Sequence, residues 1–178
     1  HGVSEFEYYE QNSEVGEIFY QCMIDWSYED AVAVANAYDF SGGHAVMDVG
    51  GGHGYLLAEI LKANPHLRGL LFEQQHVLEG ARSFFEQSGV LPRCQLVAGD
   101  FFVSIPSGAD VYIMKSVLHD WEDPECMAIL NNCRNAMGKA GRLLLVETVV
   151  PPPNEYHYAN FMDLEMLVLS GGQERTIE

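Results

Sequence analysis

One histidine stands where a buried strand is expected to deliver its side chains to the edge of a sheet. His119 lies in the stretch "KSVLHDWEDPE", after an apolar run and before several acids. The acids alone are typical of a surface turn, which does not account for the histidine. An unperturbed imidazole has a pKa of about 6.5 and can accept a proton at neutral pH. We therefore consider His119 as a general base, against the alternative of a hydrogen-bonded core histidine.

A glycine-rich motif, "MDVGGGHGYL", lies at a predicted strand-to-helix junction, where a doubly wound sheet binds its ligand. It does not match the dinucleotide fingerprint, because Tyr55 occupies the place of the third glycine. It also lacks the lysine of a phosphate-binding P-loop. The motif instead places Asp48 before the alternating glycines Gly50, Gly52 and Gly54. An acid there favours a ligand that presents an ammonium or a sulfonium group, and disfavours a pyrophosphate.

Two further acids end the next two predicted strands. Glu73 follows Gly54 by about 20 residues, the usual position of an acid that binds ribose hydroxyls. Asp100, in "VAGDFF", lies beside the same crevice and could accept a hydrogen bond from an adenine amine. A single acid at a strand end could be a solvated loop residue. Three of them beside a glycine loop favour a nucleoside-binding crevice.

The elements predicted around these residues alternate between strands and helices. Apolar spacing predicts a helix over residues 15–26 and a second, short helix over 30–38. Apolar strands are expected over 44–50, 67–73, 93–100, 109–118 and 141–150, and helices over 55–65, 76–89, 124–138 and 157–172. Asp123 is expected to cap the third of these helices, before a first-turn proline. The alternation predicts an α/β fold, with a mostly parallel sheet and helices on both faces.

The composition excludes several classes of protein. The net charge of −17, from 9 basic and 26 acidic residues, would repel nucleic acid and an anionic membrane. The four cysteines lack metal-binding spacing and are expected to be reduced. We recognise no signal peptide, and no apolar run approaches the roughly 18 residues of a membrane span. The sequence therefore predicts a cytoplasmic protein with no nucleic-acid partner, no membrane partner and no metal cluster.

In combination, these motifs resemble the S-adenosylmethionine-dependent small-molecule O-methyltransferases of the caffeate, hydroxyindole (acetylserotonin) and bacterial polyketide-tailoring type. The resemblance covers nearly the whole chain and rests on "DVGGGHGYLL", "GDFF", "LHDWED", "LLLVETVVP" and "MDLEML…GGQERT", in family order. It implies a Rossmann-like class I methyltransferase sheet, with S-adenosyl-L-methionine as cofactor and S-adenosyl-L-homocysteine as product. One departure is Glu73, where members usually have an aspartate, so the two acceptor oxygens are moved by a methylene.

The resemblance also implies roles for individual residues. It makes His119 the base, with Glu147 and Glu174 on either side of the imidazole. The implied cofactor-binding residues are Gly50 and Gly52, Glu73 at the ribose, Asp100 and Phe101 at the adenine, and Lys115. For Lys115, local pairing with an acid is the alternative. Asp48 joins this set through its place before the glycines. The implied acceptor-pocket residues are Phe19, Met23, Met162 and Met166, with Asp120 and Trp121 lining the site. Apolar residues at such spacing are usually core, which stays the alternative for the first four.

We expect residues 1–43 to be a helical lead-in that contributes to the acceptor pocket, and residues 44–178 to be the cofactor-binding catalytic domain. Sheets of this family resemble seven-stranded ones, whereas only five strands are expected here. The sequence therefore predicts the catalytic piece of a longer protein, C-terminally incomplete and lacking the last strands. By resemblance, the full-length parent is a homodimer.

The predicted function is metal-independent methyl transfer from S-adenosylmethionine to a hydroxyl of a small aromatic or polyketide-like metabolite. A second hypothesis keeps the cofactor site but uses another acceptor atom, such as nitrogen, or another reaction. A third is a non-catalytic binding or assembly domain that retains the sheet. A pure binder needs no base beside a carboxylate, so His119 and Glu147 distinguish the hypotheses.

Overall fold

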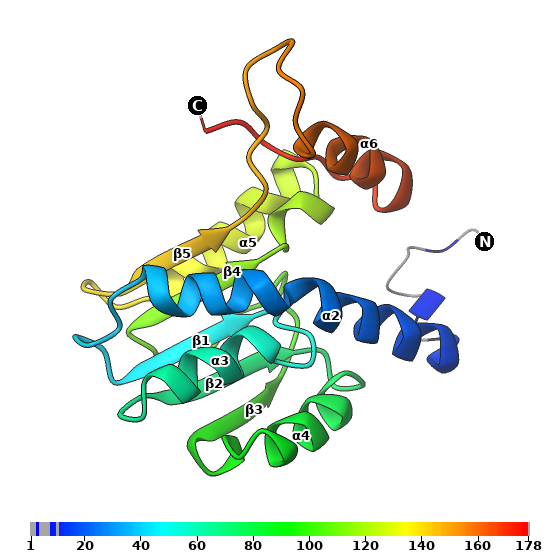
Figure 1. Cartoon of the computed structure of the whole chain (residues 1–178). Helices are drawn as coiled ribbons and strands as arrows, with labels where there is room; N and C mark the ends of the chain where they lie inside the picture. The colour runs from blue at the N-terminus through cyan, green and yellow to red at the C-terminus, as the bar shows by residue number, and fades with distance from the viewer. Residues whose placement is uncertain (1–2, 4–7, 10, 178) are drawn as a thin grey trace.

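A five-stranded parallel sheet forms the centre of the molecule (Figure 1). The computed structural model describes residues 3, 8, 9 and 11–177, apart from the side chains of residues 24–29. The strand order is β3-β2-β1-β4-β5, and every neighbouring pair is parallel. The strands are β1 (Ala45–Val49), β2 (Arg68–Glu73), β3 (Cys94–Ala98), β4 (Val111–Lys115) and β5 (Arg142–Val146).

The strand order places the predicted site. The chain passes from β1 outward to β2 and β3, then returns to the other side of β1 to form β4 and β5. Ligands of such sheets bind at the carboxyl ends of the strands, where this order reverses. All five residues of β1 are buried, as its continuous apolar run predicts, whereas β5 lies at the sheet edge with Leu145 48% exposed.

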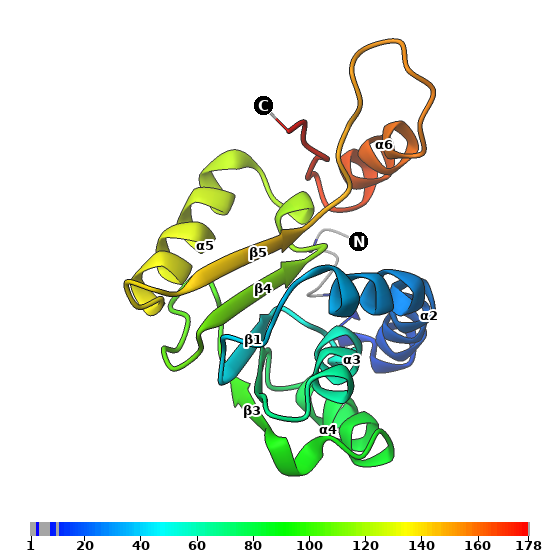
Figure 2. The same ribbon diagram turned by 60° about the vertical axis from the view of Figure 1, so that its left-hand side comes forward.

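Helices cover both faces of the sheet, as the sequence predicts (Figure 2). α3 (Tyr55–Ala63) and α4 (Leu78–Gln87) lie on one face, with α2 (Ser13–Ala37) packed on α3, and α5 (Asp123–Ala136) covers the other. The first face buries Leu57, Leu71 and Phe85 among others. The second buries a core that includes Tyr112 and Ile129. The two cores hold the strands rigid beneath the site.

α6 (Ala159–Leu169) stands beyond the carboxyl end of β5 (Figure 1). It buries Met162 and Met166. Its exposed apolar side chains are Phe161, Leu164, Leu167, Val168 and Leu169. No helix among the described residues has an apolar stretch of the length that crossing a bilayer requires.

The prediction of two short N-terminal helices is wrong, because residues 13–37 form the single helix α2. After Gly16, this segment contains no glycine or proline to interrupt it. The helix ends before Tyr38, whose backbone is extended. The lead-in therefore presents one long surface to α3.

Two local predictions near His119 also need correction. The strand expected over 109–118 ends at Lys115, and a short 3-10 turn, η2 (Leu118–Asp120), carries His119. Ser116 between them has a φ of 53°, which turns the chain away from the sheet. Asp123 does not cap α5; it is the first helical residue, and its carboxylate accepts a hydrogen bond from Arg175 instead. Another short 3-10 turn, η1 (Leu91–Arg93), precedes β3.

Candidate active site

The glycine loop between β1 and α3 leaves its backbone open to a ligand. Gly50, Gly52 and Gly54 have φ angles of 70°, 56° and 80°, which residues with a side chain rarely adopt. At Gly54 an added Cβ would also collide with the ring of Phe85. At Gly52 an added Cβ would meet no atom within 4 Å. The space beside Gly52 is therefore free for a ligand to approach.

Glu73 at the end of β2 fastens this loop to the sheet. Its Oε2 accepts a hydrogen bond of 2.9 Å from the Gly52 N–H, and its Oε1 accepts one of 2.7 Å from the Gln74 N–H. Burial raises the pKa of Glu73, and these two hydrogen bonds partly oppose that rise. The Glu73 carboxylate therefore lies against the glycine loop. Its contact with a ribose stays a prediction.

Asp48 is an almost fully buried acid beneath the loop, with 2% of its surface exposed. Neither of its carboxyl oxygens has a hydrogen-bond partner. Burial and the neighbouring Glu73 carboxylate raise the pKa of Asp48 to about 7, while the positive charge of Lys115 opposes that rise. An unpaired buried carboxyl gains free energy when a cation comes near. This environment fits a ligand that carries an ammonium group.

Lys115 connects the sheet to the N-terminal helix. Its Nζ lies 3.8 Å from Asp30 Oδ2 on α2 and 3.5 Å from Ser116 Oγ. The acid that pairs with Lys115 here is thus a distant one in the sequence, and the expected place of Lys115 at the cofactor stays a prediction. The Lys115 charge also opposes the rise in the pKa of Asp48, so the two residues belong to one electrostatic environment.

The two residues predicted at an adenine differ in their surroundings. Asp100 is exposed, and its Oδ1 accepts a hydrogen bond of 2.8 Å from the Phe102 N–H. Phe101 is partly buried and adjoins the glycine loop: a Cβ on Gly50 would lie 3.4 Å from its ring. Phe101 and Phe102 both meet Trp121 edge to face, with ring centroids 6.1 and 4.7 Å apart. Phe101, Phe102 and Trp121 thus form an aromatic wall, which adjoins the glycine loop at Phe101.

His119 and Glu174 form a direct hydrogen bond in this region. The distance from His119 Nδ1 to Glu174 Oε1 is 3.0 Å. A carboxylate of Glu174 could only accept this hydrogen bond, which would place the hydrogen on Nδ1 and leave the lone pair of a neutral imidazole on Nε2. Nε2 lies 3.6 Å from Asp120 Oδ1. The hydrogen bond orients the imidazole, as a third group orients the base in enzymes with an activated nucleophile.

Glu174 itself is nearly buried, with 6% of its surface exposed. Its Oε2 has no hydrogen-bond partner, and its backbone N–H donates to Asp163 Oδ1 of α6 at 2.9 Å. A buried carboxylate without a partner is costly, so the hydrogen bond to His119 also stabilises Glu174.

Glu147, which follows β5, supports the turn that carries His119. Its Oε1 accepts hydrogen bonds of 3.2 and 2.9 Å from the N–H groups of Val117 and Leu118. Burial raises the pKa of Glu147, and its Oε2 is buried without a partner. The potential ligand atoms of His119, Glu147 and Glu174 lie within 4.8 Å of one another. Both acids therefore converge near the imidazole, and Glu174 makes the hydrogen bond to it.

The residues predicted at the acceptor pocket lie on two separate helices. Phe19 on α2 stacks on Tyr9, with ring centroids 4.5 Å apart, and Met23 is 36% exposed. Met162 and Met166 are buried on α6, which lies beyond the carboxyl end of β5 (Figures 1 and 2). The core alternative for the two α6 methionines stays open. Their contact with an acceptor is a prediction.

Three residues near the site were missed by the sequence analysis. The ring of His53, in the glycine loop, stacks on Tyr20 of α2 at a centroid distance of 4.8 Å. Burial lowers the pKa of this histidine. Asp163 and Arg175 both hold the segment that bears Glu174. The only available signal was position, since Arg175 adjoins Glu174 in "GGQERT" and His53 lies inside the glycine motif.

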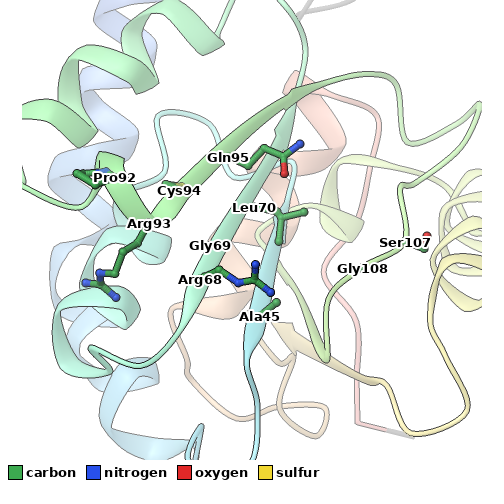
Figure 3. A pocket seen from close by; sticks show the side chains of 10 residues that line it. All are labelled: Ala45, Arg68, Gly69, Leu70, Pro92, Arg93, Cys94, Gln95, Ser107 and Gly108. Atoms are coloured by element: carbon green, nitrogen blue, oxygen red, sulfur yellow. The ribbon is translucent and has the colours of Figure 1, made fainter.

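A pocket of about 460 Å³ lies elsewhere, at the amino ends of the strands (Figure 3). Its lining includes Ala45, Arg68 and Cys94, the first residues of three strands. The guanidinium of Arg93 in its wall already donates to the carbonyls of Leu61 and Leu67. This pocket is at the opposite end of the sheet from His119.

The sheet order, the glycine loop and the acids at the strand ends define a Rossmann-like methyltransferase fold. The family model of the O-methyltransferase domain matches residues 1–178. The chain belongs to this family.

Several similar proteins are named as O-methyltransferases of bacterial natural products. Phenazine O-methyltransferase PhzM from Lysobacter antibioticus is 44% identical over 99% of this chain and 52% of its own length. Mitomycin biosynthesis 6-O-methyltransferase from Streptomyces lavendulae is 42% identical over 98% and 50%. The structure of NcsB1, an O-methyltransferase from neocarzinostatin biosynthesis, is a complex with S-adenosyl-L-homocysteine and 1,4-dihydroxy-2-naphthoic acid. It has a TM-score of 0.91 and 35% identity, covering 99% of this chain and 53% of its own. The chain thus spans about half the length of these relatives.

Two relatives carry names of other reactions. Aclacinomycin 10-hydroxylase RdmB from Streptomyces purpurascens is 40% identical over 87% of this chain and 41% of its own length. The dimethyltransferase RosA from Streptomyces davawensis, named for an N,N-dimethylated riboflavin product, has a TM-score of 0.82 and 31% identity over 99% of this chain and 53% of its own. The fold therefore occurs with other acceptor atoms and another reaction.

The raised pKa of Asp48 predicts a pH-dependent stability in the absence of ligand. Between about pH 4, where an unfolded aspartate ionises, and pH 7, the folded state binds more protons than the unfolded state. The free energy of unfolding must therefore fall as pH rises through this window. Asp48→Asn should remove at least about 1 kcal/mol of this fall, measured by urea denaturation at pH 5 and pH 8.

Glu73 and Glu147 have pKa values raised in the same direction, so the wild type keeps part of its slope in any case. The comparison between wild type and Asp48→Asn isolates the aspartate. Parallel pH curves for the two proteins would contradict a buried, protonated Asp48.

Proposed function

We propose that the chain is the catalytic domain of an S-adenosylmethionine-dependent O-methyltransferase that methylates a hydroxyl of a small aromatic or polyketide-like metabolite. His119 is the general base, and no metal takes part. The observation that supports this most is the 3.0 Å hydrogen bond between His119 Nδ1 and Glu174 Oε1, beside the glycine loop and its acids. A binding or assembly domain has no need of an oriented imidazole.

The cofactor would be held at the carboxyl ends of β1, β2 and β3. The open backbone at Gly52 gives it room, and the unpaired carboxyl of Asp48 suits its ammonium group. Glu73 would bind the ribose hydroxyls, and Phe101 would pack on the adenine. When bound, S-adenosylmethionine supplies an electrophilic methyl group, whose bond to sulfur breaks as the methyl ether forms.

His119 activates the acceptor hydroxyl. A phenol has a pKa of about 10 and is a weak nucleophile until it loses its proton, which Nε2 of His119 receives. The Glu174 carboxylate then stabilises the imidazolium through the Nδ1 hydrogen bond. Glu147 keeps the turn in place by accepting two backbone hydrogen bonds. A positioned base of this kind contributes roughly 10²–10⁴ in rate.

The acceptor pocket is formed by the aromatic wall of Phe101 and Trp121, with Asp120 beside the base and the methionines of α2 and α6 around the ring. Relatives named for phenazine and mitomycin substrates support an aromatic acceptor. Nitrogen methylation and hydroxylation are the competing reactions, because relatives bear those names. Mass analysis of the product separates them, since only O-methylation gives a methyl ether.

The same proposal includes the compartment, the partners and the oligomeric state. The acidic chain acts in the cytoplasm, without nucleic acid, and the longer protein is a homodimer. The chain spans about half the length of its relatives PhzM and the mitomycin 6-O-methyltransferase.

Cofactor binding depends on the glycine loop, which gives a direct prediction. S-adenosylhomocysteine should raise the melting temperature of the chain, because it stabilises the native state to which it binds. Gly52→Val should abolish this rise, since valine is strained at a φ of 56° and fills the open space. Calorimetry with and without the ligand measures both effects.

Gly89→Val is the matched control, because Gly89 also has a positive φ, of 71°, and faces open space but lies after α4, away from the loop. It should retain the full rise, and NAD should have no effect on any of the proteins. An unchanged rise in Gly52→Val would remove the loop from the cofactor site.

The base gives a second prediction. His119→Gln should retain the S-adenosylhomocysteine-induced rise in melting temperature and lose turnover by about 10²-fold or more. Glu147→Gln should be milder, because the amide oxygen can still accept the two backbone hydrogen bonds of the turn. Transfer of a labelled methyl group to a panel of hydroxylated aromatics measures turnover, in the longer protein if the chain is part of one. Near wild-type turnover in His119→Gln would overturn the mechanism.

Metal independence gives a third prediction. EDTA should leave turnover unchanged, because an imidazole base needs no metal. Added Zn²⁺ should inhibit, since His119, Glu147 and Glu174 converge within 4.8 Å and a zinc ion bound there would occupy the proton acceptor. Loss of turnover in EDTA, with recovery on adding a divalent metal, would refute a metal-free reaction.

A further inference from the structure

The segment that delivers Glu174 to His119 lies against the turn that carries the imidazole. Residues 172–176 have no helix or strand of their own beyond a single bridge between Val149 and Arg175. Its backbone hydrogen bonds include Gln173 N–H to His119 O at 2.8 Å, Glu174 N–H to Asp163 Oδ1 at 2.9 Å, Val150 N–H to Arg175 O at 2.9 Å and Gly172 N–H to Ser170 Oγ at 3.3 Å. A catalytic hydrogen bond carried by such a segment needs a further anchor.

The guanidinium of Arg175 spans the turn that carries His119. Its Nη1 donates to the carbonyl of Leu118 at 2.8 Å, and its Nη2 donates to the carbonyl of Trp121 at 3.0 Å. Leu118 is the first residue of η2 and Trp121 directly follows its last, so the two lie on either side of His119 and Asp120. One side chain therefore fixes the turn from both ends while its own backbone adjoins Glu174.

The third partner of this side chain is Asp123, the first residue of α5. Arg175 Nη2 lies 2.9 Å from Asp123 Oδ1, but that carboxylate is 76% exposed. Exposed ion pairs contribute little to stability. The two carbonyl contacts, which are less exposed, therefore carry most of the anchoring.

The contacts require an arginine in particular. They use Nη1 and Nη2, two nitrogens held in one plane, and so constrain both the distance and the orientation of the turn. A lysine presents its donors on one nitrogen and cannot reproduce this geometry. A glutamine removes the charge as well.

We propose that Arg175 is a positioning residue for the base: it clamps the Leu118 and Trp121 carbonyls so that Glu174 meets His119 Nδ1. Arg175 touches neither cofactor nor acceptor in this account and acts through the imidazole. The inference rests on the proposed function of His119, but the geometry it concerns can be measured without any turnover.

The readout that separates positioning from plain stability is the imidazole tautomer. Nitrogen-15 NMR at a pH of about 8.5, where an unperturbed imidazole is neutral, reports which ring nitrogen carries the hydrogen. His119→Gln identifies the signal among the seven histidines of the chain. The wild type should show a hydrogen on Nδ1, held by Glu174.

The variants are Arg175→Gln and Arg175→Lys, with Arg134→Gln as control for loss of one exposed arginine from α5. Both Arg175 variants should show a mixture of the two His119 tautomers. They should lose turnover by about 10- to 100-fold in kcat, with little change in the KM for S-adenosylmethionine, because misplacement of a catalytic group by about 1 Å costs rate in this range. The control should match the wild type in each measurement.

Arg175→Lys retains the positive charge, so it is a second variant in case Arg175→Gln fails to fold. The S-adenosylhomocysteine-induced rise in melting temperature shows whether each variant is folded. A wild-type tautomer in folded Arg175→Lys and Arg175→Gln would overturn the proposal. A different result would separate the two proposals. If the variants change the His119 tautomer but the wild type methylates no acceptor, the proposed function is wrong and the positioning role of Arg175 stands.

Discussion

The hydrogen bond between His119 and Glu174 is the interaction on which the site depends. It joins residues 55 positions apart in the sequence and brings three structural units together. The 3-10 turn after β4 supplies the imidazole, α6 holds the Glu174 backbone through Asp163, and Arg175 ties the C-terminal segment to the turn. Each partner needs the other, since the buried carboxylate requires a donor and the imidazole requires an acceptor to define its tautomer.

The site also concentrates negative charge in a region of low exposure. Asp48, Glu73 and Glu147 all have pKa values raised mainly by burial, and Glu174 lies almost wholly inside the protein. Acids gathered in this way destabilise one another until a cation arrives. The proposed reaction brings two cations to the same place, the cofactor and the imidazolium that forms on His119. The electrostatics of the crevice thus agree with the proposed chemistry.

Much of this arrangement could be predicted from the sequence. The five strands, their order along the chain and the glycine loop follow from continuous apolar runs and from Gly50, Gly52 and Gly54, which are local signals. The pairing of His119 with Glu174 came from family motifs, because no periodicity connects residues so far apart. The single helix α2 was missed because the spacing of apolar residues does not report whether two helical stretches are continuous.

The remaining features depend on tertiary contacts that leave no local pattern. Arg175 contacts Leu118 and Trp121 across more than 50 residues, and His53 stacks on Tyr20 of another element. Asp123 has the sequence context of an N-cap, yet its carboxylate is taken by Arg175. In each case, a long-range partner competes with the local preference and determines the outcome.

The central claim is that His119 receives the proton of the acceptor hydroxyl. It is tested most directly by a crystal structure of the protein with S-adenosylhomocysteine and a phenolic acceptor that the protein methylates. The account predicts the hydroxyl oxygen at about 2.6–3.2 Å from His119 Nε2, with Nδ1 still bonded to Glu174. A hydroxyl bound to another side chain, with Nε2 facing only solvent or protein, would contradict it.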